Sequence, residues 1–139
     1  MTTYVLDTDM LSLWQHGHVA VSQRVSAHSV KELAITVITV QEQLDGWHAR
    51  LARTKDRQHL ANLYKRLAAT VRFLSKAQIL PFPEEAIERY EELQSQKVNI
   101  GKMDLRIAAI ALQLGHTVVT RNTRDFRRVP GLIIEDWAA

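Results

Sequence analysis

Apolar positions along the chain alternate between short runs and helical spacings, and the order of these patterns predicts an α/β fold. Short apolar or β-branched runs predict strands at 3–7, 33–37, 79–80, 117–120 and 132–134. Apolar residues at intervals of three and four predict helices at 8–15, 19–28, 39–52, 56–74, 84–96 and 102–114. Strands that alternate with helices indicate a mostly parallel sheet of four to five strands, flanked by helices on both faces.

The length and composition narrow the class of protein. A chain of 139 residues, with 46% hydrophobic and 24% charged residues, predicts one globular domain spanning 1–139. The sequence has no run of eighteen or more apolar residues, so no membrane span is predicted. Its strand-like start does not resemble a signal peptide. The chain has no cysteine, which excludes disulfides and thiolate metal sites and is compatible with the cytoplasmic location that we expect.

Acidic residues lie where predicted strands end or where the following helices begin. Asp7 closes the first strand, and Glu42 lies just past the second. Asp125 follows the strand at 117–120. Asp104 is in the first turn of the helix at 102–114, and its neighbours three, four and seven positions later are apolar, which directs it toward the core.

Each acid also has a local explanation. Asp7 can cap the first helix, Thr39 and Glu42 form a capping box, and Asn122 can cap the turn that contains Asp125. Capping does not predict that all four acids lie near one edge of one sheet, where parallel α/β folds bind ligands. Clustered carboxylates repel unless a cation offsets them, and oxygen ligands favour Mg²⁺ or Mn²⁺. Such an ion suits a phosphate ester, because it neutralises the phosphate and activates water.

Basic residues supply a complementary charge. The net charge is +3, which is permissive for an anionic partner. Four arginines crowd the fourth acid and could hold the backbone of a polyanion: Arg121, Arg124, Arg127 and Arg128. A second basic stretch is interpreted mainly as solvated helix surface and turn, with nucleic-acid contact as the alternative: Arg50, Arg53, Lys55 and Arg57. Trp47 lies on a predicted amphipathic helix and is expected in the core or an interface.

Several segments, in this order and spacing, match a known family. They are Tyr4 through Ser12, Glu42 with Leu44, Gly101 through Ala109, Thr120 through Phe126, Val129 through Leu132 and Glu135 through Trp137. With them the chain resembles the PIN-domain ribonucleases, and most closely the VapC-type toxins of bacterial toxin–antitoxin pairs. The resemblance implies a three-layer PIN-like fold and a Mg²⁺-dependent endoribonuclease, with Mn²⁺ as a possible replacement. It also implies an RNA substrate, a cognate antitoxin of a type II system and a homodimer.

The resemblance assigns roles by position. The implied metal and catalytic acids are Asp7, Asp104, Glu42 and Asp125, with Glu42 orienting or deprotonating the water and Thr120 supplying a hydroxyl beside the metal. Asn122 stands where many relatives carry an acid, so either its carbonyl or Asp125 completes the site. The expected RNA contacts are Arg121, Asn122 and Arg124.

Two alternatives come from other classes. A haloacid-dehalogenase-like phosphatase would use Asp7 and Asp9 after the first strand, but Leu11 stands where that family has Thr or Val. In the ribonuclease interpretation Asp9 is only an acid in the first helical turn. A non-catalytic RNA-binding module would keep the arginines without needing the acids. The intact acids Asp7, Glu42 and Asp104 argue against that module.

Overall fold

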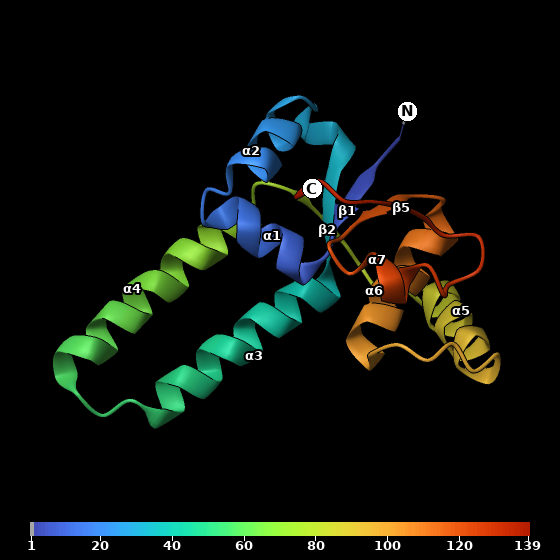
Figure 1. The fold of residues 1–139 in the computed structure, drawn as a ribbon. Helices are drawn as coiled ribbons and strands as arrows, with labels where there is room; N and C mark the ends of the chain where they lie inside the picture. The colour runs from blue at the N-terminus through green and yellow to red at the C-terminus, as the bar shows by residue number, and fades with distance from the viewer. Residues whose placement is uncertain (1) are drawn as a thin grey trace.

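The computed structural model describes residues 2–139 and contains one five-stranded sheet in the order β3-β2-β1-β4-β5 (Figure 1). Every neighbouring pair of strands is parallel. The strands are β1 (Tyr4–Leu6), β2 (Leu33–Thr36), β3 (Gln78–Leu80), β4 (Thr117–Val119) and β5 (Ile133–Glu135). The chain builds outward from β1 to β3 on one side and then returns to place β4 and β5 on the other. The strand order therefore reverses between β1 and β4, which is where such sheets bind ligands.

Helices connect the strands and cover both faces of the sheet. They are α1 (Thr8–Gln15), α2 (Val19–Ser26), the 3-10 helix η1 (Val30–Glu32), α3 (Val37–Arg53), α4 (Arg57–Leu74), α5 (Glu84–Ser95), α6 (Lys102–Leu114) and the short α7 (Thr123–Phe126). The predicted three-layer α/β class with a parallel sheet is confirmed. The sequence pattern did not predict η1 or α7, whose three and four residues are too few to show helical periodicity.

Alternating strand residues fill two separate cores, as expected when successive side chains point to opposite faces. Leu6 and Val119 face a core that contains residues of α1, α2 and the end of α4. Val5 and Val118 face the other core, which contains residues of α5, α6 and α7. Two residues from each of the three central strands are completely buried: Val5 and Leu6 of β1, Ala34 and Ile35 of β2, and Val118 and Val119 of β4. The central strands thus give the residues that follow them a rigid base.

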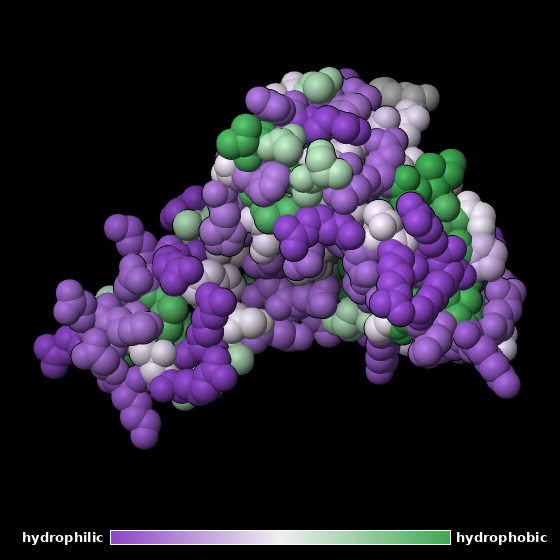
Figure 2. Space-filling model, in the orientation of Figure 1, coloured by the Kyte–Doolittle hydropathy of each residue, from purple (hydrophilic) through white to green (hydrophobic). Residues whose placement is uncertain are grey.

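Helices α3 and α4 extend beyond the sheet as a hairpin arm (Figure 1). The loop 54–56 joins them, and Asp56 caps α4 by accepting a 2.9 Å hydrogen bond from the amide of His59. The visible surface of this arm is mostly hydrophilic (Figure 2). Within residues 2–139, the length and apolarity that a membrane-crossing helix needs do not occur together in any helix.

The beginning of α3 differs from the prediction. We predicted that Thr39 begins this helix, but it begins at Val37, and Thr36 is the capping residue, accepting from the amide of Thr39 at 3.3 Å. The apolar run at 33–37 concealed this boundary, because β-branched residues are common in strands and also tolerated in a first helical turn. As a result Thr39 is fully buried inside the helix and caps nothing.

Candidate active site

Asp7 lies at the carboxyl end of β1, at the point where the strand order reverses. One carboxylate oxygen accepts from the backbone amide of Met10 at 2.9 Å, which caps α1. The other accepts from the hydroxyl of Thr120 at 2.6 Å, and Thr120 directly follows β4. The sequence left open whether Asp7 caps a helix or belongs to a site. In the structure Asp7 caps α1, and it also lies where the predicted site should be.

The environment of Asp7 disfavours its charge. Its side chain is buried, and burial is the main reason that its pKa is raised from 3.8 to about 6. The hydrogen bonds from Thr120 and Met10 act in the opposite direction, and the charges of Asp104 and Asp9 raise the pKa further. A cation near this carboxylate would relieve both the burial penalty and the repulsion.

Asp104, in the first turn of α6, is the electrostatic centre of the predicted acids. Burial is the largest cause of its raised pKa, followed by the charges of Glu42, Asp125 and Asp9. A hydrogen bond with the side chain of Asn122 lowers the pKa in part. Asp104 therefore interacts with the other three predicted acids, which lie at the end of β1, on α3 and on α7, and Asp9 of α1 adds a fifth charge. We had interpreted Asp9 only as a first-turn acid; its exposed position on α1 agrees with that, yet its charge reaches both Asp7 and Asp104.

Glu42 is not part of a capping box, so that alternative is wrong. Because α3 begins at Val37, Glu42 lies in its second turn. Its carboxylate accepts a 2.6 Å hydrogen bond from the hydroxyl of Thr8, the first residue of α1. The Thr8 hydroxyl also lies 3.1 Å from that of the buried Thr39. No local sequence pattern indicates this contact, because the partners are more than thirty positions apart.

Asn122 and Asp125 form a local pair around α7. The amide nitrogen of Asn122 donates to the carboxylate of Asp125 at 2.9 Å, and its side chain does not cap the helix, contrary to the sequence alternative. The backbone amide of Asn122 donates to the hydroxyl of Thr120 at 2.9 Å. This chain of contacts runs from Asp125 through Asn122 and Thr120 to Asp7. Asn122 thus connects the fourth acid to the rest of the site.

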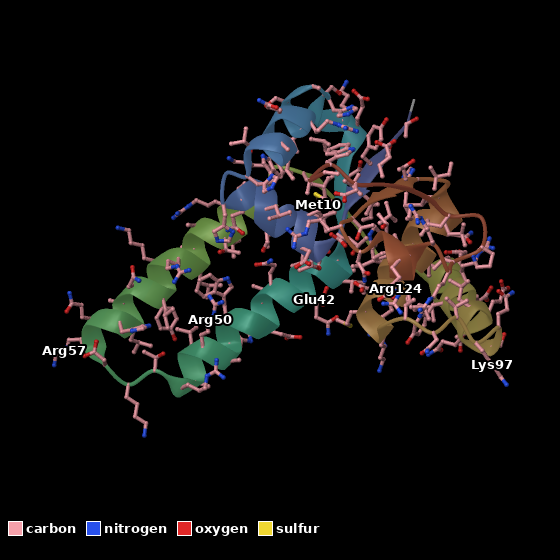
Figure 3. The ribbon with its side chains drawn as sticks, in the orientation of Figure 1. Met10, Glu42, Arg50, Arg57, Lys97 and Arg124 are labelled. Carbon is pink, nitrogen blue, oxygen red and sulfur yellow. The ribbon has the colours of Figure 1, made fainter. Side chains whose placement is uncertain are left out.

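The arginines near Asp125 differ in whether their charge is free to bind an anion. Arg128 donates to the carbonyl of Asn99 at 2.6 Å and lies 3.8 Å from Asp125, so its charge is partly compensated. Arg121 and Arg124 are exposed and have no ion-pair partner within residues 2–139. Figure 3 shows Arg124 on α7 and Glu42 on α3. The two exposed arginines keep their predicted place beside the acids, and their contact with RNA stays a prediction.

The donor set is suited to a hard cation. Carboxylate oxygens from separate elements converge around Asp104, but no compact group of three His, Asp or Glu side chains is preformed within residues 2–139. Mg²⁺ commonly uses one or two carboxylates and completes its shell with water and substrate phosphate. A loose group of acids, in which burial and neighbouring charges raise the pKa of Asp7 and Asp104, therefore fits this ion better than it fits a cation that needs a closed cage of protein ligands.

Comparison with known families agrees with this fold. The PIN domain family matches residues 4–132, which include all of the predicted acids. The chain therefore belongs to the PIN domain family. This membership contradicts the haloacid-dehalogenase alternative, which the first strand and Asp9 had left open.

Individual relatives define the branch of the family. The chain is 34% identical to the VapC ribonuclease Y4jK of Sinorhizobium fredii over 139 residues, covering 96% of each chain. It is 30% identical to the tRNA(fMet)-specific endonuclease VapC of Salmonella typhimurium over 113 residues, covering 78% of each. The structure of DNA-bound VapBC from Salmonella typhimurium superposes with a TM-score of 0.79 at 27% identity, covering 99% of both chains. These matches place the protein among the VapC-type ribonucleases of toxin–antitoxin systems.

Proposed function

We propose that this protein is a Mg²⁺-dependent endoribonuclease that hydrolyses phosphodiester bonds in RNA. The observation that carries the proposal is the group of acids around Asp104 at the carboxyl end of the sheet. Burial and mutual repulsion raise the pKa of both Asp7 and Asp104. Such an arrangement is unfavourable without a cation and favourable with one.

Each residue then has a distinct task. Asp7 and Asp104 hold the metal, which when bound lowers the pKa of water and neutralises the phosphate. Glu42 orients or deprotonates the attacking water, and the hydroxyl of Thr8 fixes the carboxylate of Glu42 for this task. Asp125 is the fourth acid. Thr120 holds the carboxylate of Asp7 in place through its 2.6 Å hydrogen bond.

We also propose a substrate and a partner. The Salmonella relative is named a tRNA(fMet)-specific endonuclease, so this folded RNA, the initiator tRNA, is the first substrate to test. Solved relatives are VapBC assemblies, some bound to DNA, which supports a cognate antitoxin as the partner of this chain. A homodimer is expected by the same analogy.

Metal removal tests the proposed chemistry. Cleavage of initiator tRNA should fall to background in EDTA and return when excess Mg²⁺ or Mn²⁺ is added, because the acids would hold the ion that activates water. Gel analysis of end-labelled RNA measures this loss and recovery. A small phosphomonoester serves as the control substrate and should not be hydrolysed. RNA cleavage that persists in EDTA would contradict the proposal.

Thr8 gives a second test of the assigned roles. Thr8→Val removes the hydrogen bond to Glu42 and should slow single-turnover cleavage by roughly 10-fold, a typical effect of losing an outer-shell partner. Thr8→Ser is the matched control, because it keeps the hydroxyl and should retain most of the rate. Equal rates for the two variants would show that the Thr8 hydroxyl does not position Glu42.

A further inference from the structure

A groove runs from the candidate active site along the α3–α4 arm. Its first part is a cavity of about 470 Å³ between α1, α3 and α4, which Glu42 lines at one end and Arg50 and Arg66 at the other. An adjoining cavity of about 370 Å³ shares the same two arginines and adds Arg53 and His59. Among residues 2–139, Glu42 is the only acid that lines either cavity. The groove therefore leads from a catalytic carboxylate into a cationic region.

Two arginines in this groove are fixed in place by an aromatic ring. The guanidinium carbons of Arg50 and Arg66 lie 4.9 Å and 5.1 Å from the ring centroid of Trp47. Trp47 is buried between the helices, as its amphipathic position predicted. Neither arginine has an ion-pair partner in the part of the chain that the structure describes. A guanidinium that stacks through its face keeps its edge N–H groups available for a phosphate.

Gly46 keeps the groove open between its two ends. Glu42, Gly46 and Arg50 are spaced by four residues and share one face of α3, which is labelled at Glu42 and Arg50 in Figure 3. Glycine is unfavourable inside a helix, and apart from the adjoining backbone of α3 and the two neighbouring residues, nothing lies within 4 Å of the position that a Cβ of residue 46 would take. The fold therefore does not require glycine at this position, but a ligand that lies along the helix would benefit from the space.

We propose that this groove binds the sugar–phosphate backbone of the substrate RNA, with Arg50 and Arg66 as its phosphate contacts. The inference rests on the proposed ribonuclease activity and extends it to substrate binding. Arg50 is about 12 Å from Glu42 along the helix axis, so a strand whose scissile phosphate lies at the acids reaches the arginines within a few nucleotides. The uncompensated charges favour RNA over a protein segment as the occupant. The second basic stretch of the sequence is thus divided, because Arg50 and Arg53 line the groove whereas Lys55 and Arg57 do not.

The salt dependence of binding tests this inference. Fluorescently labelled initiator tRNA is titrated with Asp104→Asn protein in EDTA at several NaCl concentrations, so that cleavage does not interfere. Arg50→Gln and Arg66→Gln, added to this background, should each weaken binding several-fold. Each should also reduce the slope of log K against log[salt] by roughly 0.7 to 1, the contribution of one phosphate contact.

Matched variants separate charge from packing and from non-specific effects. Arg72→Gln changes an exposed arginine of α4 that lines neither cavity, and it should leave affinity and slope unchanged. Arg50→Lys and Arg66→Lys alter stacking on Trp47 but keep the charge, so they should keep most of the slope. Gly46→Gln should maintain or raise the Tm through helix propensity while it weakens RNA binding by filling the groove.

The outcomes distinguish this inference from the proposed function. If the slope of log K against log[salt] is unchanged in the Arg50→Gln, Arg66→Gln double variant, the groove does not bind RNA, even if cleavage is metal-dependent. Equal losses in the Arg72→Gln control overturn the inference as well. Loss of antitoxin binding with unchanged RNA binding would assign the groove to the protein partner and reject the inference. Conversely, cleavage that survives EDTA rejects the metal mechanism, whereas a reduced slope in the arginine variants still supports the groove.

Discussion

Asp104→Asn should reduce the rate of RNA cleavage by more than the roughly 10- to 100-fold that loss of an outer-shell partner costs. Asp104 is the acid whose pKa responds to three other carboxylates, so it occupies the centre of the charge that a metal would neutralise. Asparagine keeps the size of the side chain and removes the charge. The single-turnover rate of tRNA cleavage at saturating Mg²⁺ is the measurement.

A control on the neighbouring helix makes this result specific. Asp45→Asn removes an exposed charge from α3, and Asp45 does not line the groove. It should cleave RNA at the rate of the unmodified protein. If Asp104→Asn retained full activity with an unchanged Tm, Asp104 could not be a metal ligand. The same result would reject the proposal that the acids around it form the active site.

Asp7→Asn should stabilise the metal-free protein at neutral pH. The carboxyl of Asp7 has a pKa of about 6 in the folded protein, against 3.8 for the unperturbed group, and burial is the main cause. Between these values the folded state holds a proton that the unfolded chain has released. The free energy of unfolding therefore falls as pH rises from about 4 to 6 and stays reduced above that range. The difference between these two pKa values corresponds to at most about 3 kcal/mol of unfolding free energy. We therefore expect the free energy of unfolding of Asp7→Asn to exceed that of the unmodified protein by about 1–3 kcal/mol.

Urea unfolding in EDTA at several pH values measures this effect. The gain should be present near pH 7 and largely absent near pH 4, where folded Asp7 is protonated and therefore as neutral as asparagine. Asparagine is as good a capping residue as aspartate, so the contact with Met10 is preserved. Saturating Mg²⁺ should stabilise the unmodified protein and not the variant. A loss of stability in EDTA at neutral pH would indicate that the negative charge serves the helix cap.

Most of the fold could be predicted from the sequence because the central strands are buried and most of the helices are long. In the runs around Val5, Ile35 and Val118 the side chains that point to either face of the sheet are apolar, as a parallel sheet covered on both faces requires. Gly115, with a φ of 70°, ends α6 where the sequence placed the end. The beginning of α3 was wrong because Val37 and Ile38 continue the apolar run without a polar break. Strand length alone could not decide which of these residues was helical.

The site could be predicted only in part. Asp7, Glu42, Asp104 and Asp125 follow strands or begin helices, and the topology of a parallel sheet brings such positions together. The contact between Thr8 and Glu42 depends on how α1 packs against α3, and no local pattern reports that packing. The same holds for Arg66, which comes from α4 to stack on Trp47 of α3. Contacts between helices depend on side-chain packing, which the spacing of apolar residues along one helix does not specify.

The hydrogen bond between Thr120 and Asp7 joins residues 113 positions apart, and β1 pairs with β4 along its whole length. Contacts between such distant segments form late, because closing a long loop is entropically unfavourable. A ribosome that has made only the first hundred residues carries a chain without Asp104, Thr120 and β4, so the proposed active site is not yet complete. On the proposed function, the nuclease can become active only after α6 and β4 have been made. The translating cell thus has an interval in which an inhibitor can be present before the first active molecule is released.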